Sequence, residues 1–219
     1  MLFRSYKEFD ESRHVIREAD YPVLDSYWTY LVGLDWGISH NCAIMFCAVD
    51  YDGHFIVWDE IVDHEKPVDY YAPLIKAKMV GKNYDFFISP DTLRRDKFRN
   101  GVQYSVFQEF SEQGLLPICA NNQVDAGINK NKQLLANGKI SIFERCTELR
   151  AGIRRYKWKE TTGGHEEPAK IRDDEVDAWR YAVATYFSNP DKPEPPMQRN
   201  SVEFFRQLSQ PMRRQSVGV

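Results

Sequence analysis

The sequence predicts an α/β fold with a mixed central sheet, in which three antiparallel strands come first and parallel strands follow, and helices flank the sheet. Two patterns indicate this. Three apolar, strand-like runs follow one another with only turn residues between them, and apolar runs then alternate with amphipathic helical stretches. A chain of 219 residues is also long enough to bury one good core. We therefore expect one compact domain.

The three opening strands are expected at residues 30–37, 41–50 and 54–62. The first ends in an Asp-x-Gly sequence, which indicates a strand followed by a turn. The second and third are separated by Tyr51-Asp52-Gly53, a hairpin turn signal. This order predicts a three-stranded antiparallel meander.

Helices and strands alternate in the rest of the predicted domain. The predicted helices cover residues 68–80, 101–113, 125–137, 146–156 and 173–187. The predicted strands cover residues 84–89, 115–120 and 140–143, and Pro117 should place the middle one near an edge or bulge. Residues 157–171 read as a loop or hairpin. The domain is thus expected over residues 30–188, after a lead-in segment (1–29) and before a flexible, Pro- and Arg-containing tail (189–219).

Aspartates occupy positions where α/β sheets collect function. Asp35 ends the first strand and Asp91 directly follows the fourth, and ligands bind at the carboxyl ends of such strands. Asp174 and Asp177 are three residues apart at the start of the last helix, so they share a face. An acid-rich first turn is also an ordinary helix start. Three separate acidic positions that converge, however, repel one another unless a metal ion or protons offset their charge.

The ligand chemistry favours hard cations. Oxygen ligands select Mg²⁺ or Mn²⁺, and two such ions would activate water and stabilise the leaving oxygen in phosphodiester hydrolysis. The five histidines are scattered, and the four cysteines form no CxxC pair. We therefore expect two divalent cations, Mg²⁺ or Mn²⁺, and reduced, inert cysteines.

Basic residues are clustered although the net charge of the chain is −3. Arg94, Arg95 and Lys97 follow Asp91 and are candidates for contacts with DNA phosphates. Lys157 and Lys159, ahead of the last helix, are candidates for steering a duplex into the cleft. Such runs are also typical of solvated helix faces.

The sequence resembles the nuclease domain of bacteriophage large terminase subunits, which is RNase H-like, over residues 30–188. The resemblance rests on LVGLDWG, FFISPD and DDEVDAWRYAV, and on GINKNKQLLANGKISIFERC followed by RRYKWKE. Its most specific part is D-x-x-D-A-x-R-Y. It implies that Asp35, Asp91 and Asp177 are catalytic metal ligands and that Asp174 is a fourth or alternative one. The family often has a glutamate near Gly152, which this chain lacks.

The resemblance implies a metal-dependent endonuclease that cuts duplex viral DNA with little sequence specificity during genome packaging. Its implied partners are double-stranded DNA, a terminase ATPase domain, the small terminase subunit and the portal protein. No G-x-x-x-x-G-K-[ST] motif occurs, so no ATPase site is expected in this chain. No signal peptide and no apolar run long enough to span a bilayer is present, so we expect the cytoplasm of the host cell and no membrane contact.

Three other functions agree with parts of the sequence. A resolvase or integrase relative would share the RNase H-like fold and the carboxylates. A non-catalytic DNA-binding or assembly module could retain the fold alone. Half of an actin- or sugar-kinase-like ATPase would also open with a strand ending in Asp-x-Gly, but its second Asp-x-Gly and its glycine-rich adenosine motif are missing.

Overall fold

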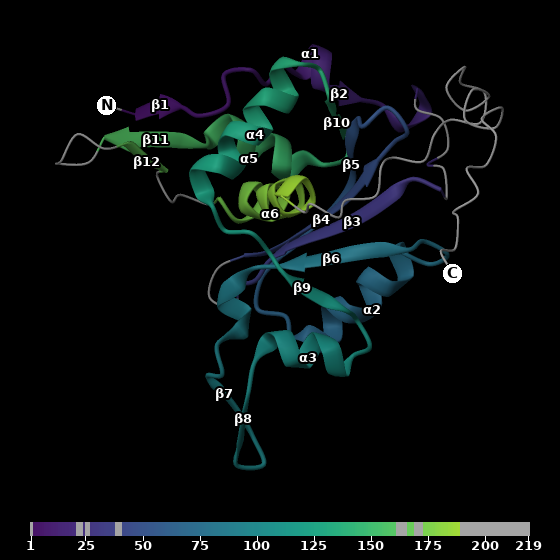
Figure 1. Ribbon diagram of the computed structural model, residues 1–219, viewed down its shortest axis with the longest axis vertical. Helices are drawn as coiled ribbons and strands as arrows, with labels where there is room; N and C mark the ends of the chain where they lie inside the picture. The colour runs from purple at the N-terminus through teal and green to yellow at the C-terminus, as the bar shows by residue number, and fades with distance from the viewer. Residues whose placement is uncertain are drawn as a thin grey trace, which may run out of the picture.

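A seven-stranded mixed sheet forms the centre of the molecule (Figure 1). The computed structural model describes residues 2–20, 24, 27–37, 41–160, 166–168 and 173–188. The strands lie in the order β2 (Val15–Ile16), β10 (Ile140–Phe143), β5 (Phe55–Asp63), β4 (Cys42–Val49), β3 (Thr29–Asp35), β6 (Tyr84–Ile88) and β9 (Pro117–Cys119). Strands β3, β4 and β5 pair antiparallel, and the outer strands pair parallel. The predicted mixed sheet is confirmed, and Pro117 lies in an edge strand as expected.

Helices cover both faces of this sheet (Figure 1). On one side are α4 (Val124–Ala136), α5 (Thr147–Arg155) and α6 (Asp174–Ser188); on the other are α2 (Val68–Lys78) and α3 (Val106–Glu112). Because both faces are covered, every residue of β4 is buried, which explains its nearly continuous apolar sequence. The two cysteines of β4 are free and buried, and all four cysteines of the chain are free. Within the described part of the chain, no helix is long and apolar enough to cross a membrane.

The helix predicted over residues 101–113 is wrong in its first part. The chain forms a hairpin of β7 (Lys97–Arg99) and β8 (Val102–Tyr104), which projects from the body in Figure 1. Asn100 and Gly101 form its turn with φ of 53° and 79°, as tight hairpins require. Helix α3 starts only at Val106, because Ser105 and Gln108 form a capping box.

The N-terminal segment packs against the rest of the domain. Strand β1 (Leu2–Arg4) pairs with β11 (Lys157–Glu160), which also pairs with β12 (Glu166–Pro168) in a second sheet. After α1 (Glu11–His14), β2 joins the edge of the central sheet, and η1 (Glu18–Asp20) follows. The predicted lead-in therefore contributes strands to both sheets. The predicted tail, residues 189–219, lies outside the described residues.

Candidate active site

The first two predicted aspartates lie at the same edge of the central sheet. Strands β3 and β6 are parallel neighbours, with Leu34 opposite Ile88. Asp35 is the last residue of β3, and Asp91 lies in η2 (Pro90–Leu93), just after β6. Hydrogen bonds join the two strand ends: the Ser89 amide donates to the Leu34 carbonyl at 3.0 Å, and the Trp36 amide donates to Ser89 Oγ at 3.1 Å.

Helix α6 brings the other two aspartates over this edge because Gly33 lets it lie directly on β3. A Cβ atom at Gly33 would overlap the Ala178 carbonyl and come within 2.9 Å of Ala182 Cβ. The glycine two residues before Asp35 and the alanine directly after Asp177 therefore form one close crossing. This crossing sets the height of the acidic first turn of α6 above the strand ends.

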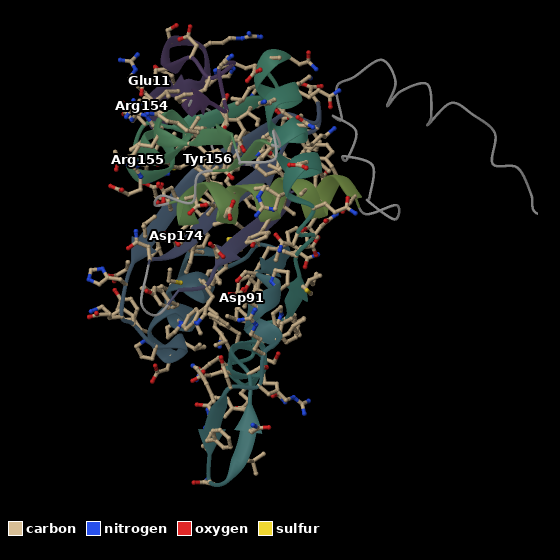
Figure 2. All side chains as sticks on the ribbon, turned by 90° about the vertical axis from the view of Figure 1, so that its left-hand side faces the viewer. Glu11, Asp91, Arg154, Arg155, Tyr156 and Asp174 are labelled. Atoms are coloured by element: carbon tan, nitrogen blue, oxygen red, sulfur yellow. The ribbon has the colours of Figure 1, made fainter. Side chains whose placement is uncertain are left out.

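All four predicted aspartates line one cavity of about 640 Å³. Figure 2 shows Asp91 on the lower side of this region and Asp174 on the upper side. The cavity is also lined by Trp36, Asn41, Pro90, Arg94, Asn122, Asp173 and Tyr181. The structure therefore confirms that the acidic positions converge, and it adds Asp173 as a fifth carboxylate.

The carboxylates of the cavity are close enough to affect one another. Burial raises the pKa of Asp35 well above its ordinary value, and the charges of Asp177, Asp91 and Asp174 raise it further. Arg180 acts in the opposite direction. Carboxylates gathered in this way favour either protonation or a bound cation.

The negatively charged atoms that could ligate a metal ion in the cavity are carboxylate oxygens. Oxygen ligands of this kind fit Mg²⁺ or Mn²⁺. Among the described residues, no three acidic, histidine or cysteine side chains are grouped so as to hold an ion by themselves. The aspartates line an open cavity instead of forming a closed cage. Mg²⁺ commonly binds one or two carboxylates and keeps several waters, which matches this arrangement.

Arg180 is a residue of this site that the sequence analysis did not select. Its side chain is 1% exposed, and its Nε donates to Asp177 Oδ1 at 3.1 Å. Its terminal nitrogens lie 3.4 Å from Asn122 Oδ1. Its position in the sequence, one helical turn after Asp177 and within D-A-x-R-Y, could have indicated that Arg180 belongs to the site.

Glu175 lies in the same acidic turn but belongs to a different environment. It is 1% exposed and forms an ion pair with Arg155 of α5. Burial raises the pKa of Glu175 to about 7. A Cβ atom at Gly152 would overlap the Glu175 carboxylate. The absence of a side chain at Gly152 therefore leaves the space that the Glu175 carboxylate occupies.

The predicted DNA-binding residues occupy different surroundings. Arg94 lines the cavity, and Arg95, the next residue in the chain, is exposed. Lys97 instead pairs with Glu109 at 2.9 Å, and its Nζ lies 5.6 Å from the centre of the Trp36 ring. Lys157 is exposed on β11, whereas the side chain of Lys159 lies outside the described residues.

The fold is that of the RNase H-like nuclease domains of phage large terminases. The large terminase of a thermophilic bacteriophage superposes with a TM-score of 0.71 at 21% identity, covering 84% of this chain and 46% of the phage protein. The chain therefore spans about half the length of that protein.

Two isolated nuclease domains have the same fold. The P22 large terminase nuclease domain has a TM-score of 0.63 at 19% identity, covering 83% of this chain and 91% of that domain. The nuclease domain of the large terminase from bacteriophage SPP1, solved with bound Mn, has a TM-score of 0.58 at 14% identity, covering 77% of this chain and 93% of that domain. No family model matches the sequence, and no curated protein matches it.

Proposed function

We propose that this chain is a metal-dependent endonuclease that hydrolyses phosphodiester bonds of duplex DNA during viral genome packaging. The main support is the convergence of Asp35, Asp91, Asp174 and Asp177 on one cavity at the carboxyl ends of β3 and β6. Terminase nuclease domains share the fold, and one was solved with bound Mn. By analogy with terminase nuclease domains, we propose that the cutting has little sequence specificity.

Asp35, Asp91 and Asp177 would hold two divalent cations, with Asp174 as a fourth or alternative ligand. Bound cations of this kind supply Lewis acidity and lower the pKa of coordinated water. The ends of β3 and β6, which hydrogen bonds join, fix Asp35 and Asp91. Arg94, at the cavity wall, is suited to bind a phosphate of the DNA backbone.

The path of the DNA is proposed from the basic residues that follow η2 and those of β11. Arg94 and Arg95 would contact phosphates on the η2 side, and Lys157 and Lys159 on the β11 side. By analogy with large terminases, an ATPase domain, the small terminase subunit and the portal protein are proposed as partners. The proposed location is the cytoplasm of the infected cell.

Plasmid cleavage tests this function. Supercoiled plasmid is incubated with the protein and Mn²⁺ or Mg²⁺, with and without EDTA, alongside Asp35→Asn and Asp177→Asn. We expect metal-dependent cutting that falls at least about a hundredfold in either variant. Asp125→Asn is a matched control, because Asp125 also lies in the first turn of a helix but does not line the cavity. Cutting in EDTA, or parent rates in both site variants, would refute the proposal.

A further inference from the structure

Arg180 places a buried positive charge directly behind one of the proposed metal ligands. Its side chain is 1% exposed, and its Nε donates to Asp177 Oδ1 at 3.1 Å. A buried guanidinium is costly to desolvate unless it is paired and hydrogen-bonded. Its presence at this position therefore needs an explanation, because an apolar side chain would fill the same space with no such cost.

Two further neighbours, Asn122 and Gly127, hold the Arg180 side chain in place. Asn122, which lines the cavity, has its Oδ1 3.4 Å from both terminal nitrogens of Arg180. The aliphatic part of the arginine lies against Gly127 of α4, where a Cβ atom would be 2.7 Å from Arg180 Cγ. The long side chain thus lies in a slot that α4 leaves open by having glycine there.

This arrangement limits how Asp177 can turn. The hydrogen bond from Arg180 Nε to Oδ1 fixes one oxygen of the Asp177 carboxylate. Asp177 is itself among the cavity-lining residues. The arginine therefore orients the carboxylate that the proposed function assigns to a cation.

The same geometry gives the arginine an electrostatic effect on the cavity. Its positive charge is one hydrogen-bond length from a lining carboxylate, in a region shielded from water. A divalent cation at the carboxylates would be repelled by it, and this repulsion is poorly screened in the protein interior.

We propose that Arg180 is a positioning residue that holds Asp177 in its ligating orientation and weakens the affinity of the cavity for divalent cations. This inference rests on the proposed function, because it assumes that Asp177 binds a cation. If so, substitutions of Arg180 can separate its effect on the orientation of Asp177 from the effect of its charge on cation affinity. Arg180→Gln removes the charge and the ion pair, whereas Arg180→Lys keeps the charge but cannot reach Asp177 and Asn122 together.

The test measures Mn²⁺ affinity without DNA, by electron paramagnetic resonance of free Mn²⁺, together with kcat for plasmid cleavage. Arg180→Gln should bind Mn²⁺ at least about tenfold more tightly, because a repulsive charge is lost, and cut at least about tenfold more slowly. Arg180→Lys keeps the repulsive charge but loses the orientation of Asp177, so it should bind Mn²⁺ no more tightly than the parent and cut at least about tenfold more slowly. A purely structural role would lower affinity and rate together.

Arg155→Gln is the matched control, since Arg155 pairs with Glu175 of the same acidic turn and does not line the cavity. It should leave both measurements at parent values. Parent or weaker Mn²⁺ affinity in Arg180→Gln overturns the charge effect, and parent kcat in Arg180→Lys overturns the positioning effect. If Arg180→Gln does not fold, Arg180→Met replaces it in the test of the charge effect, and Arg180→Lys still decides the positioning effect by its rate. A parent protein that binds no Mn²⁺ would instead refute the proposed function.

Discussion

At the scale of single residues, Gly33 determines whether the acidic turn of α6 reaches the strand ends. Gly33→Ala should push α6 away from β3, because the new Cβ would overlap the Ala178 carbonyl. We expect a loss of about 1–3 kcal/mol in the free energy of unfolding, as for other overpacked sites. DNA cleavage should fall at least about tenfold, because the aspartates would be displaced. Urea denaturation and plasmid cleavage measure the two effects.

The control for Gly33→Ala is Gly81→Ala. Gly81 has a φ of +74° and open space around it, so alanine should strain the backbone without moving the cavity. A similar loss of stability with unchanged cleavage is expected. If Gly33→Ala cleaved DNA at the parent rate, the close crossing of α6 and β3 would not be needed for the site.

Glu175 should make stability depend on pH between about 4.5 and about 7. Burial raises its pKa from 4.5 in the unfolded chain to about 7 in the folded protein. The folded state therefore binds a proton in this window that the unfolded state has lost. The associated stabilisation is complete below pH 4.5 and is lost as the pH rises through about 7.

Thermal unfolding from about pH 4.5 to about pH 8 tests this assignment. Glu175→Gln should show a flatter dependence of Tm on pH than the parent, because the titrating group is absent. Asp125→Asn, at an exposed helix start, serves as the control and should follow the parent curve. Parallel curves for parent and Glu175→Gln would rule out Glu175 as the source.

The four acidic positions could be predicted from the sequence because each has a local signal. Asp35 and Asp91 follow apolar strands, and Asp174 and Asp177 share a helical face. The roles of Arg180 and Glu175 could not be predicted in this way. Both depend on neighbours distant in the chain, Asn122 and Gly127 for the arginine and Arg155 and Gly152 for the glutamate.

At the scale of elements, the β7–β8 hairpin shows why the predicted helix over residues 101–113 began too early. Asn100-Gly101 is a turn dipeptide, and Ser105-x-x-Gln108 is a capping-box sequence, so both signals were present. Strands of three residues, however, are too short for their alternation to stand out against a helical pattern. The start of α3 is therefore determined by the hairpin turn and the capping box, not by hydrophobic periodicity.

The placement of the hairpin separates the basic residues near η2 into two groups. Replacing Arg94 and Arg95 together by glutamine should weaken binding to all DNA sequences alike and reduce its salt dependence. Arg94 lines the cavity, Arg95 is its exposed neighbour in the chain, and both would contact phosphates. Titration of labelled duplexes at several salt concentrations measures this. An unchanged salt slope would remove both arginines from the interface.

Lys97→Gln is the informative comparison for those arginines. Lys97 pairs with Glu109 and lies near the Trp36 ring, so its loss should lower stability more than DNA affinity. Denaturation midpoints and the same titrations distinguish these effects. A DNA affinity reduced as far as in the double arginine variant would place Lys97 at the DNA as well.

At the scale of the whole molecule, segments far apart in the sequence complete the sheets. Strand β2 has two residues and pairs with β10, and β1 pairs with β11. Such short strands have no periodicity to detect, and their pairing depends on tertiary packing. The mixed order of the longer strands could be predicted, because the turn after the second strand and the alternating helices are visible in the sequence.

Asp35, Asp91 and Asp177 are proposed to surround divalent cations in the cavity between the strand ends and α6. Anomalous diffraction from crystals soaked in Mn²⁺ tests this proposal most directly, because Mn²⁺ is located without reference to activity. We expect anomalous density within coordination distance, about 2.0–2.6 Å, of oxygen atoms from these aspartates. Mn²⁺ bound only elsewhere, or a cavity that stays free of density at saturating Mn²⁺, would contradict it.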